Sequence, residues 1–272
     1  MEAKTDRVAL VTGASSGIGE AAAGALVGAG FTVYGTSRRA TPGEKRGEVV
    51  FLPLDVTDDE SVAGVVREVL ERSGRIDVLV NNAGVGIAGA AEESSIEQAR
   101  ALFETNVFGS IRMTRAVLPH MREQGGGRIV NVSSVLGLVP APFMALYAAT
   151  KHAIEGYSES LDHEVRDHGV RVLLVEPAYT KTSFDANTVA ADEPLELYAR
   201  RREAIDVLNA AAVRAGDEPS VVSQVIVAAA TDTRPRLRYP AGTLARRVSK
   251  LRRYVPPAIF DKQIRKTSQL AA

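Results

Sequence analysis

A tyrosine and a lysine four residues apart could perform acid–base chemistry in this chain. Tyr147 and Lys151 lie in the segment YAATKHAIEGYSESLDHEV, where Ile154, Leu161 and Val165 recur at helical spacing. A helix would place the phenol and the ammonium on one face, one turn apart. A nearby cation favours a phenolate, so Lys151 would lower the pKa of Tyr147 from its ordinary value of about 10. The pair predicts a proton donor and acceptor, although Tyr-x3-Lys alone also occurs by coincidence on helix surfaces.

A serine lies where a hydroxyl could assist this chemistry. Ser134 is thirteen residues before Tyr147, at the end of the β-rich run RIVNVSS. If that run is a strand of a parallel sheet, its end lies at the edge where such folds bind ligands. A hydroxyl at this position could hydrogen-bond a substrate oxygen.

A glycine-rich loop could bind the phosphates of a nucleotide. The segment TGASSGIG at residues 12–19 follows the apolar run RVALV and precedes an alanine-rich stretch. In a strand–loop–helix unit, glycines allow a tight turn and a close backbone approach to a pyrophosphate, and the helix N-terminus adds N–H donors. The spacing predicts dinucleotide binding, with a purely structural turn as the alternative. The predicted contacts in this loop are Gly13, Ser15, Ser16, Gly17, Ile18 and Gly19.

The residues after the second apolar run indicate which dinucleotide is bound. A fold selective for NAD places an acid there to hold the ribose hydroxyls. This chain has Ser37, Arg38 and Arg39 instead. A guanidinium binds a 2′-phosphate through charge-assisted hydrogen bonds, whereas a carboxylate repels it. We predict NADP(H), with Arg38 as the main reader and Ser37 assisting; the alternative is that both arginines are solvated loop residues.

Short β-rich runs alternate with helical patterns along the chain. Such alternation predicts an α/β fold, a Rossmann-type doubly wound parallel sheet of about seven strands with helices on both faces. No linker divides residues 1–272, so a single domain is expected. The runs expected to form strands are 7–13, 31–37, 49–56, 77–84, 128–134, 170–177 and 236–242.

Capping patterns and composition place the helices. Thr57 followed by Glu60 predicts a capping box at one helix start, and Ser95 with Gln98 predicts another. Residues 179–217 are polar and alanine-rich, and this stretch is expected to be helical and to cover the substrate.

Composition excludes several kinds of protein. The chain has no cysteine, which excludes disulfides and thiolate metal sites and fits a reducing cytosol, so a cytoplasmic location is expected. Formal net charge is zero, which gives no reason to expect nucleic acid as a partner. The short apolar run near the N-terminus fits neither a signal peptide nor a membrane span. The four histidines lack metal-ligand spacing, and no metal site is predicted.

Charge is distributed unevenly despite the zero balance. Between Arg234 and Lys266 there are eleven Lys or Arg residues against one acid, Asp261. The C-terminal tail at 243–272 is therefore basic. It could be a solvated face or a subunit contact, or it could make peripheral contact with anionic lipid or an acidic partner.

Several motifs, in order and in spacing, resemble the short-chain dehydrogenase/reductase family over roughly residues 7–182. They are TGASSGIG at 12–19, NNAG at 81–84, Asn106 in NVFGS, Ser134 and YAATK at 147–151. The resemblance implies a catalytic tetrad of Asn106, Ser134, Tyr147 and Lys151. Tyr147 would be the general acid and base, and Ser134 would polarise the carbonyl. Lys151 would hold the nicotinamide ribose and lower the Tyr147 pKa, and Asn106 would hold a water in the proton relay. Ser134 is preferred to Ser133 because it has the family spacing to the tyrosine.

The same resemblance implies further cofactor contacts. They are Asp55, Val56, Asn82, Ala83, Gly84, Pro177 and Thr182. The first two would contact adenine, the next three would line the adenosine side, and Thr182 would reach the carboxamide. The family usually has Pro-Gly after the sixth strand, whereas this chain has Pro177 and Ala178, a departure that bears on the backbone beside the nicotinamide. A homodimer or homotetramer built from the helices at about 98–123 and 147–168 is also implied.

The surroundings of the tetrad predict a lipophilic substrate. Apolar side chains after Ser134 and before Tyr147 would line the pocket, or could instead fill the core. They are Leu136, Leu138, Val139, Pro140, Phe143 and Met144. The long C-terminal part resembles the branch with steroid and retinoid dehydrogenases, so hydride transfer to or from a steroid-, retinoid- or fatty-ketone-like molecule is expected. The alternatives are a 3-ketoacyl thioester reductase and a non-catalytic NADP(H)-sensing protein.

Overall fold

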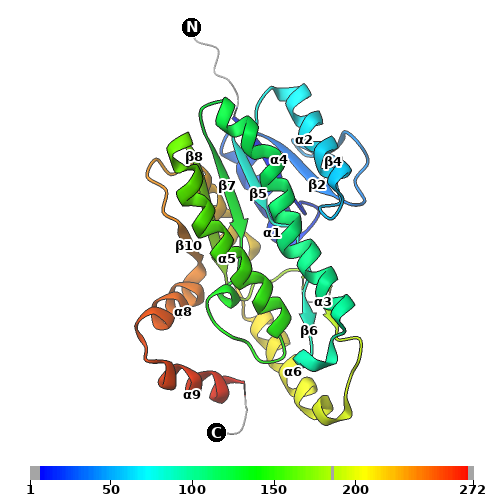
Figure 1. Cartoon of the computed structure of the whole chain (residues 1–272), viewed down its shortest axis with the longest axis vertical. Helices are drawn as coiled ribbons and strands as arrows, with labels where there is room; N and C mark the ends of the chain where they lie inside the picture. Colours follow the sequence, from blue (N-terminus) through cyan, green and yellow to red (C-terminus); the bar gives the residue numbers. More distant parts are fainter. Residues whose placement is uncertain (1–6, 185–186, 269–272) are drawn as a thin grey trace.

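An eight-stranded sheet runs through the centre of the computed structural model, which describes residues 7–184 and 187–268 (Figure 1). In the order in which they lie side by side, the strands are β10 (Arg238–Ala241), β8 (Val170–Pro177), β7 (Gly127–Val132), β5 (Val78–Asn81), β1 (Arg7–Val11), β2 (Phe31–Ser37), β4 (Val49–Pro53) and β3 (Glu44–Arg46). Seven of them, from β10 to β4 in this order, are parallel to one another. Chain order reverses between β1 and β5, which creates the crevice where doubly wound sheets bind ligands. The predicted Rossmann-type α/β fold is confirmed.

The sheet has one strand more than the seven predicted. β3 reads Glu-Lys-Arg and pairs antiparallel with β4 at the edge of the sheet. Because backbone hydrogen bonds alone can hold an exposed edge strand, its sequence carries no apolar signal. Two more short strands, β6 (Ile87–Ala88) and β9 (Val189–Ala190), form a separate parallel pair.

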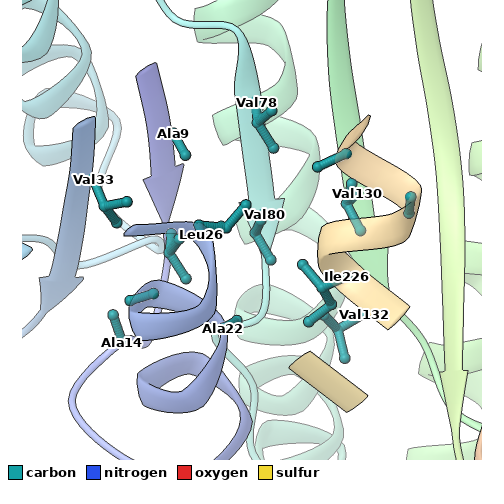
Figure 2. Close-up of a cluster of buried hydrophobic side chains, with 14 of the residues drawn as sticks. Ala9, Ala14, Ala22, Leu26, Val33, Val78, Val80, Val130, Val132 and Ile226 are labelled. Carbon is teal, nitrogen blue, oxygen red and sulfur yellow. The ribbon is translucent and has the colours of Figure 1, made fainter. Parts of the chain in front are cut away.

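Helices cover both faces of the sheet. One face carries α1 (Gly17–Gly28) and α7 (Pro219–Thr231), and the other carries α2 (Asp59–Ser73), α4 (Gly109–Glu123) and α5 (Ala145–Val165). Side chains of β5 alternate between the two cores: Val78 and Val80 join α1 and α7 (Figure 2), and Leu79 joins the opposite core. Burial on both faces explains why the central strands read as continuous apolar runs.

The start of α2 differs by one residue from the prediction. Asp58 is the cap, and its carboxylate accepts hydrogen bonds from the N–H groups of Glu60 (2.8 Å) and Ser61 (3.0 Å). The assignment of Thr57 as the cap is therefore wrong. Thr57 instead donates its hydroxyl to the carboxylate of Asp55, at 2.7 Å.

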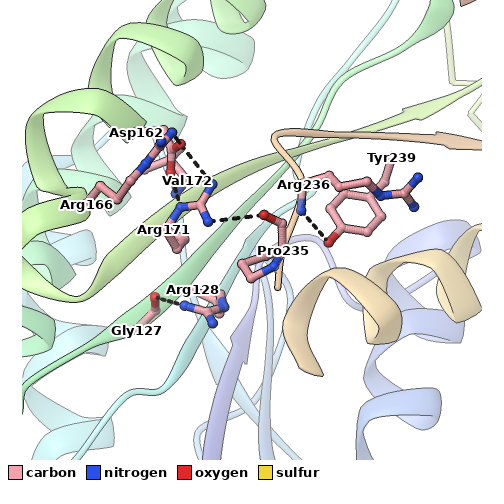
Figure 3. A network of polar contacts seen from close by, with 9 residues as sticks. All are labelled: Gly127, Arg128, Asp162, Arg166, Arg171, Val172, Pro235, Arg236 and Tyr239. Carbon is pink, nitrogen blue, oxygen red and sulfur yellow. Dashed lines mark hydrogen bonds and ion pairs between the residues drawn. The ribbon is translucent and has the colours of Figure 1, made fainter. Parts of the chain in front are cut away.

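A buried carboxylate anchors α5 to the sheet (Figure 3). Asp162 accepts hydrogen bonds from Arg171 Nε (2.8 Å) and Nη2 (3.1 Å), and from the Val172 N–H (2.9 Å). It also pairs with Arg166, and Arg171 continues to the carbonyl oxygen of Pro235 (3.1 Å). Although burial acts to raise it, the hydrogen bonds from Arg171, Val172 and Arg166 hold the pKa of Asp162 below its usual value. The network fixes α5 relative to β8 and to the chain that enters β10.

The chain between α2 and α5 contains the other predicted capping pair. Ser95 caps α3 (Ile96–Phe103) by accepting a hydrogen bond from the Gln98 N–H at 3.1 Å, as predicted. A π-helical turn at Glu104–Phe108 joins α3 to α4.

The chain after β8 is less helical than its composition suggests. Within 179–217, helix α6 covers only Ala199–Arg214. The N–H groups of Val189 and Ala191 bond the carbonyl oxygens of Gly86 and Ala88 (2.9 and 3.0 Å), which holds the earlier part of the stretch extended. Helices α8 (Gly242–Tyr254) and α9 (Pro257–Thr267) follow β10 and lie at one end of the molecule (Figure 1). Across the described residues, no helix has the length and apolar character that crossing a bilayer requires.

Candidate active site

The predicted site residues gather at one edge of the sheet. Gly13 follows β1, Arg38 follows β2, Asp55 follows β4, Asn82 follows β5, Ser134 follows β7 and Thr182 follows β8. Because these strands are parallel, their carboxyl ends share this edge, on both sides of the point where the strand order reverses.

The glycine loop has the backbone that a phosphate site requires. Gly13 and Gly17 have φ values of +65° and +58°, a region that favours glycine. A Cβ on Gly19 would lie 2.2 Å from the Gly13 carbonyl oxygen, so no larger side chain fits there. Ser16 caps α1 with extended backbone and no side-chain hydrogen bond to the helix, which leaves the first N–H groups of α1 for an anion. These features fit a bound dinucleotide phosphate.

The loop after β5 holds the glycine loop in place. Asn82 Nδ2 donates to the carbonyl oxygens of Thr12 (3.0 Å) and Gly13 (3.1 Å). The Thr12 hydroxyl accepts hydrogen bonds from the N–H groups of Asn82 and Ala83, both at 3.0 Å. Asn82 and Ala83, which the family resemblance places on the adenosine side, therefore hold the glycine loop in shape directly.

Two hollows flank this part of the edge. One, of about 990 Å³, is bordered by Gly17 and Thr182. The other, of about 480 Å³, is bordered by Arg38 and Asp55. Hydrogen bonds from the Thr57 N–H and hydroxyl hold the pKa of Asp55 below its usual value, and the charge of Arg38 acts in the same direction. Arg38 is exposed at the end of β2, the position beside which dinucleotide-binding folds hold the adenosine ribose.

Tyr147 and Lys151 are brought together in a buried position. Both lie in the first turns of α5 and are 8% exposed. Lys151 Nζ lies 5.5 Å from the centre of the Tyr147 ring and donates to the carbonyl oxygen of Val132 at 3.0 Å. Burial lowers the pKa of Lys151 to about 8, so the ammonium persists at neutral pH. The Phe184 ring packs against Tyr147, with ring centres 5.6 Å apart.

Asn106 lies in the π-helical turn, a distortion that recurs at functional sites. Its Oδ1 accepts from the Val85 N–H and its Nδ2 donates to the Val85 carbonyl oxygen, both at 2.9 Å. Nδ2 also contacts the hydroxyl of Thr150 at 3.3 Å, next to Lys151. Asn106 thus joins the chain after Gly84 to the helix that carries the tyrosine and lysine.

The two serines after β7 differ in access. Ser134 is half-buried and its hydroxyl accepts from the Leu136 N–H at 3.1 Å. Ser133 is 2% exposed, and its Oγ lies 2.8 Å from where a Cβ on Gly137 would be, beneath the loop. Only Ser134 can therefore reach a molecule bound at the edge without rearrangement.

Comparison with known proteins places the chain in a family. Residues 7–193 match the short chain dehydrogenase family. The chain belongs to the short-chain dehydrogenase/reductase family. It is therefore an oxidoreductase. It is 44% identical over 181 residues to 3-ketodihydrosphingosine reductase of Bacteroides thetaiotaomicron, an alignment that covers 66% of each chain. It is 35% identical to human retinol dehydrogenase 8, over 87% of this chain and 81% of that one.

Solved structures of short-chain dehydrogenases share the fold. A short-chain dehydrogenase from Streptomyces avermitilis is 37% identical and superposes with a TM-score of 0.78 over 97% of this chain and 99% of that one. Two enzymes from Burkholderia were solved with different cofactors. The one from B. cenocepacia holds NADP (27% identical, TM-score 0.75, 94% and 97% covered), and the one from B. phymatum holds NAD (28%, 0.74, 88% and 90%).

In this short-chain dehydrogenase, two acids that were not identified from the sequence, Glu93 and Asp192, hold the chain after β9 in place. Glu93 is fully buried, accepts from the Leu195 N–H at 2.8 Å and pairs with Arg202 of α6. Asp192 accepts from the Ser95 hydroxyl at 2.6 Å. Neither Glu93 nor Asp192 lies in a motif, and no local sequence pattern marks either acid as one that holds a distant segment. These contacts hold residues 192–202 against the segment at 93–95, and Phe184, earlier in the chain, packs on Tyr147.

A polar network inside the sheet was also missed. Asn81 and Asn131 are register partners on β5 and β7, and Asn81 Nδ2 donates to Asn131 Oδ1 at 2.9 Å. Asn131 in turn donates to Ser158 of α5 at 2.8 Å. An asparagine at the same position of two apolar runs is the signal that could have identified this pair. The network ties α5 to the strands whose ends carry Asn82 and Ser134.

Glycine 19 offers a test of the phosphate loop. We expect Gly19→Ala to lower the free energy of unfolding by about 1–3 kcal/mol and to weaken nucleotide binding, because its Cβ would overlap the Gly13 carbonyl oxygen. Gly24→Ala is the matched control on the same helix, because Gly24 is exposed and no atom lies within 4 Å of its Cβ position. This change should raise the free energy of unfolding by about 0.5–1 kcal/mol. Urea unfolding and fluorescence titration with NADPH measure both. Equal behaviour of the two variants would contradict the proposed loop.

Proposed function

We propose that this short-chain dehydrogenase interconverts a ketone and a secondary alcohol with NADP(H), on a lipophilic substrate. The observation that carries the proposal is the buried pair at the sheet edge, with the Lys151 ammonium 5.5 Å from the Tyr147 ring. A cation in a position of low dielectric favours the phenolate, which lets a tyrosine exchange a proton near neutral pH.

Each residue of the tetrad has a separate role in the proposed reaction. In the reductive direction the Tyr147 hydroxyl donates its proton to the substrate oxygen, and Lys151 stabilises the phenolate that remains. The Ser134 hydroxyl donates a hydrogen bond to the same oxygen and orients it. A bound nicotinamide supplies or accepts the hydride. Asn106 orders the chain around Val85 and Thr150, and with a bound water it would relay the proton from solvent.

Arg38 supports the choice of NADP(H) over NAD. We expect Arg38→Asp to weaken NADPH binding by about 10–100-fold and NADH binding much less, because a carboxylate would replace a charge-assisted partner of the 2′-phosphate. Arg39→Asp makes the same charge change at the next exposed residue and should have a smaller effect. Fluorescence titration measures the affinities of the parent and of both variants for NADPH and for NADH. Equal losses for NADPH and NADH would refute the assignment.

Aromatic and aliphatic side chains near Tyr147 support a lipophilic substrate. Phe184 packs on Tyr147, and Phe143, four residues before the tyrosine, packs edge-on against Tyr198 with ring centres 6.1 Å apart. Phe143 has a φ of +65°, a strained conformation for a bulky residue and one that recurs at functional sites. Val139 is 6% exposed and fills the core, whereas Leu136 and Leu138 are half-buried. The segment 179–217, fastened through Glu93, would cover a bound substrate.

The names of two relatives support a lipophilic substrate, since 3-ketodihydrosphingosine and retinol are both largely hydrocarbon. The test is NADPH oxidation by the purified protein with a panel of steroid, retinoid, long-chain and thioester ketones. Turnover of a long-chain, steroid or retinoid ketone supports the proposal. Turnover of thioesters alone would favour a ketoacyl thioester reductase. NADPH binding without any turnover would favour a sensing protein.

A further inference from the structure

Helices α8 and α9 form a basic arm, residues 242–267. The arm contains eight Lys or Arg residues against one acid, Asp261. Since the whole chain has zero formal net charge, the rest of the protein carries the compensating negative excess. Charge is therefore polarised across the molecule, with the positive end at the arm.

One face of α8 presents apolar side chains to solvent. Leu244 and Leu251 are 46% and 51% exposed, and they lie two turns apart on the same face. Tyr254, one turn further, is 75% exposed. Arg247 lies between the leucines along this face, and Lys250 lies beside it. The face combines exposed apolar groups with cations at its margin.

The other side of α8 fixes the direction of this face. Ala245 is fully buried against the protein. Arg252 Nε donates to the carbonyl oxygen of Leu138 at 3.0 Å, so the helix is also tied to the loop that follows Ser134. The apolar stripe of α8 therefore points away from the protein, next to the substrate side of the site.

Helix α9 repeats the pattern. Ile259 is 60% exposed, and Lys262 and Lys266 are on its face at spacings of three and seven residues. In the described part of the chain, no acid pairs with Arg247, Lys250 or Lys262. Their charges are thus available to an external anion.

We propose that the basic arm docks on an anionic lipid surface. Exposed leucine, isoleucine and tyrosine would enter the headgroup region, and the flanking Lys and Arg side chains would bind lipid phosphates. A flat lipid surface fits this pattern better than an acidic protein, because the apolar groups are spread along two helices rather than gathered in a groove. The negative excess elsewhere on the protein would orient the arm toward the membrane.

Docking would hold the loop that contains Leu138 close to the bilayer. If the proposed function is correct, a lipophilic substrate could then pass from lipid to the site over a short path. This consequence rests on the proposed function, whereas docking itself does not.

The test is co-sedimentation of the full chain with vesicles, without cofactor or substrate. We expect binding to vesicles of phosphatidylcholine and phosphatidylglycerol in equal parts, and little binding to phosphatidylcholine alone. High salt should weaken binding at least about tenfold. The double variants Leu244→Asn/Leu251→Asn and Arg247→Glu/Lys250→Glu should each weaken it at least about tenfold. The control Leu197→Asn/Val207→Asn, at positions 79% and 63% exposed outside the arm, should bind like the parent.

Three results would overturn the proposal. The first is no preference for the anionic vesicles. The second is self-association in sedimentation velocity that the leucine variant abolishes, with no vesicle binding, which would make the arm an interface between copies. The third is binding to polyglutamate that survives the leucine substitutions, with no vesicle binding, which would indicate an acidic protein partner. Thermal unfolding of every variant serves as the control for an intact fold, and each variant should unfold at the temperature of the parent. Ketone turnover, measured separately, tests the proposed function.

Discussion

Tyr147→Phe should lower kcat by about 10²–10⁴-fold and leave NADPH affinity nearly unchanged. The substitution removes only the phenolic oxygen, the atom proposed to exchange a proton with the substrate. The ring remains to fill a position that is 8% exposed and to pack on Phe184 at 5.6 Å, so the fold should persist. Lys151 keeps its hydrogen bond to the Val132 carbonyl oxygen and can still hold the cofactor. Steady-state kinetics with the best ketone of the panel and NADPH titration measure the two effects.

Tyr157→Phe is the matched control for that experiment. Tyr157 lies on the same helix, ten residues after Tyr147, and its half-buried ring packs against the core beneath α2, α4 and α5. We expect kcat of this variant within about twofold of the parent, because no group at the reacting atoms changes. If Tyr147→Phe retained parental turnover, or if both variants lost activity equally, the tyrosine would not be the proton donor.

The central sheet could be predicted because its strands are buried on both faces and therefore read as apolar runs. The edge strand β3 could not, since Glu44, Lys45 and Arg46 carry no apolar signal. The two-residue strands β6 and β9 were not predicted for a related reason. Hydrogen bonds to the segment after β5, not local conformational preference, hold residues 189–190 extended. Alanine-rich composition favoured helix there, and pairing with the segment after β5 prevailed.

The sequence predicted those site residues whose role depends on their own side chain or on a partner close by in the chain. Gly19 has no room for a Cβ, and Tyr147 and Lys151 meet because four residues make one helical turn. Residues that position those groups were not found. Glu93 acts through Leu195 and Arg202, about a hundred residues away in the chain, and no local pattern encodes a partner at that separation.

Asp162→Asn should lower the free energy of unfolding by about 3 kcal/mol at neutral pH. Asp162 is fully buried and accepts hydrogen bonds from Arg171 and from the Val172 N–H, and it pairs with Arg166. A neutral amide removes the charge that compensates Arg171, whose side chain is only 17% exposed, and presents an N–H group toward the guanidinium. Urea unfolding measures the loss. Asp167→Asn, exposed on the turn after α5, is the control and should change stability by less than about 0.5 kcal/mol.

The loss should depend on pH in a direction set by the carboxylate. The pKa of Asp162 is lower in the folded protein than in the unfolded chain, so its contribution is complete above the unfolded value of about 3.9 and disappears as pH falls through the folded value. The stability difference between parent and Asp162→Asn should therefore be constant from neutral pH down to about 5 and shrink below about 4. Because α5 carries Tyr147 and Lys151 at its other end, activity of the variant should fall with its folded fraction. A difference in stability that stayed constant to low pH would show that the anchor depends on packing rather than on charge.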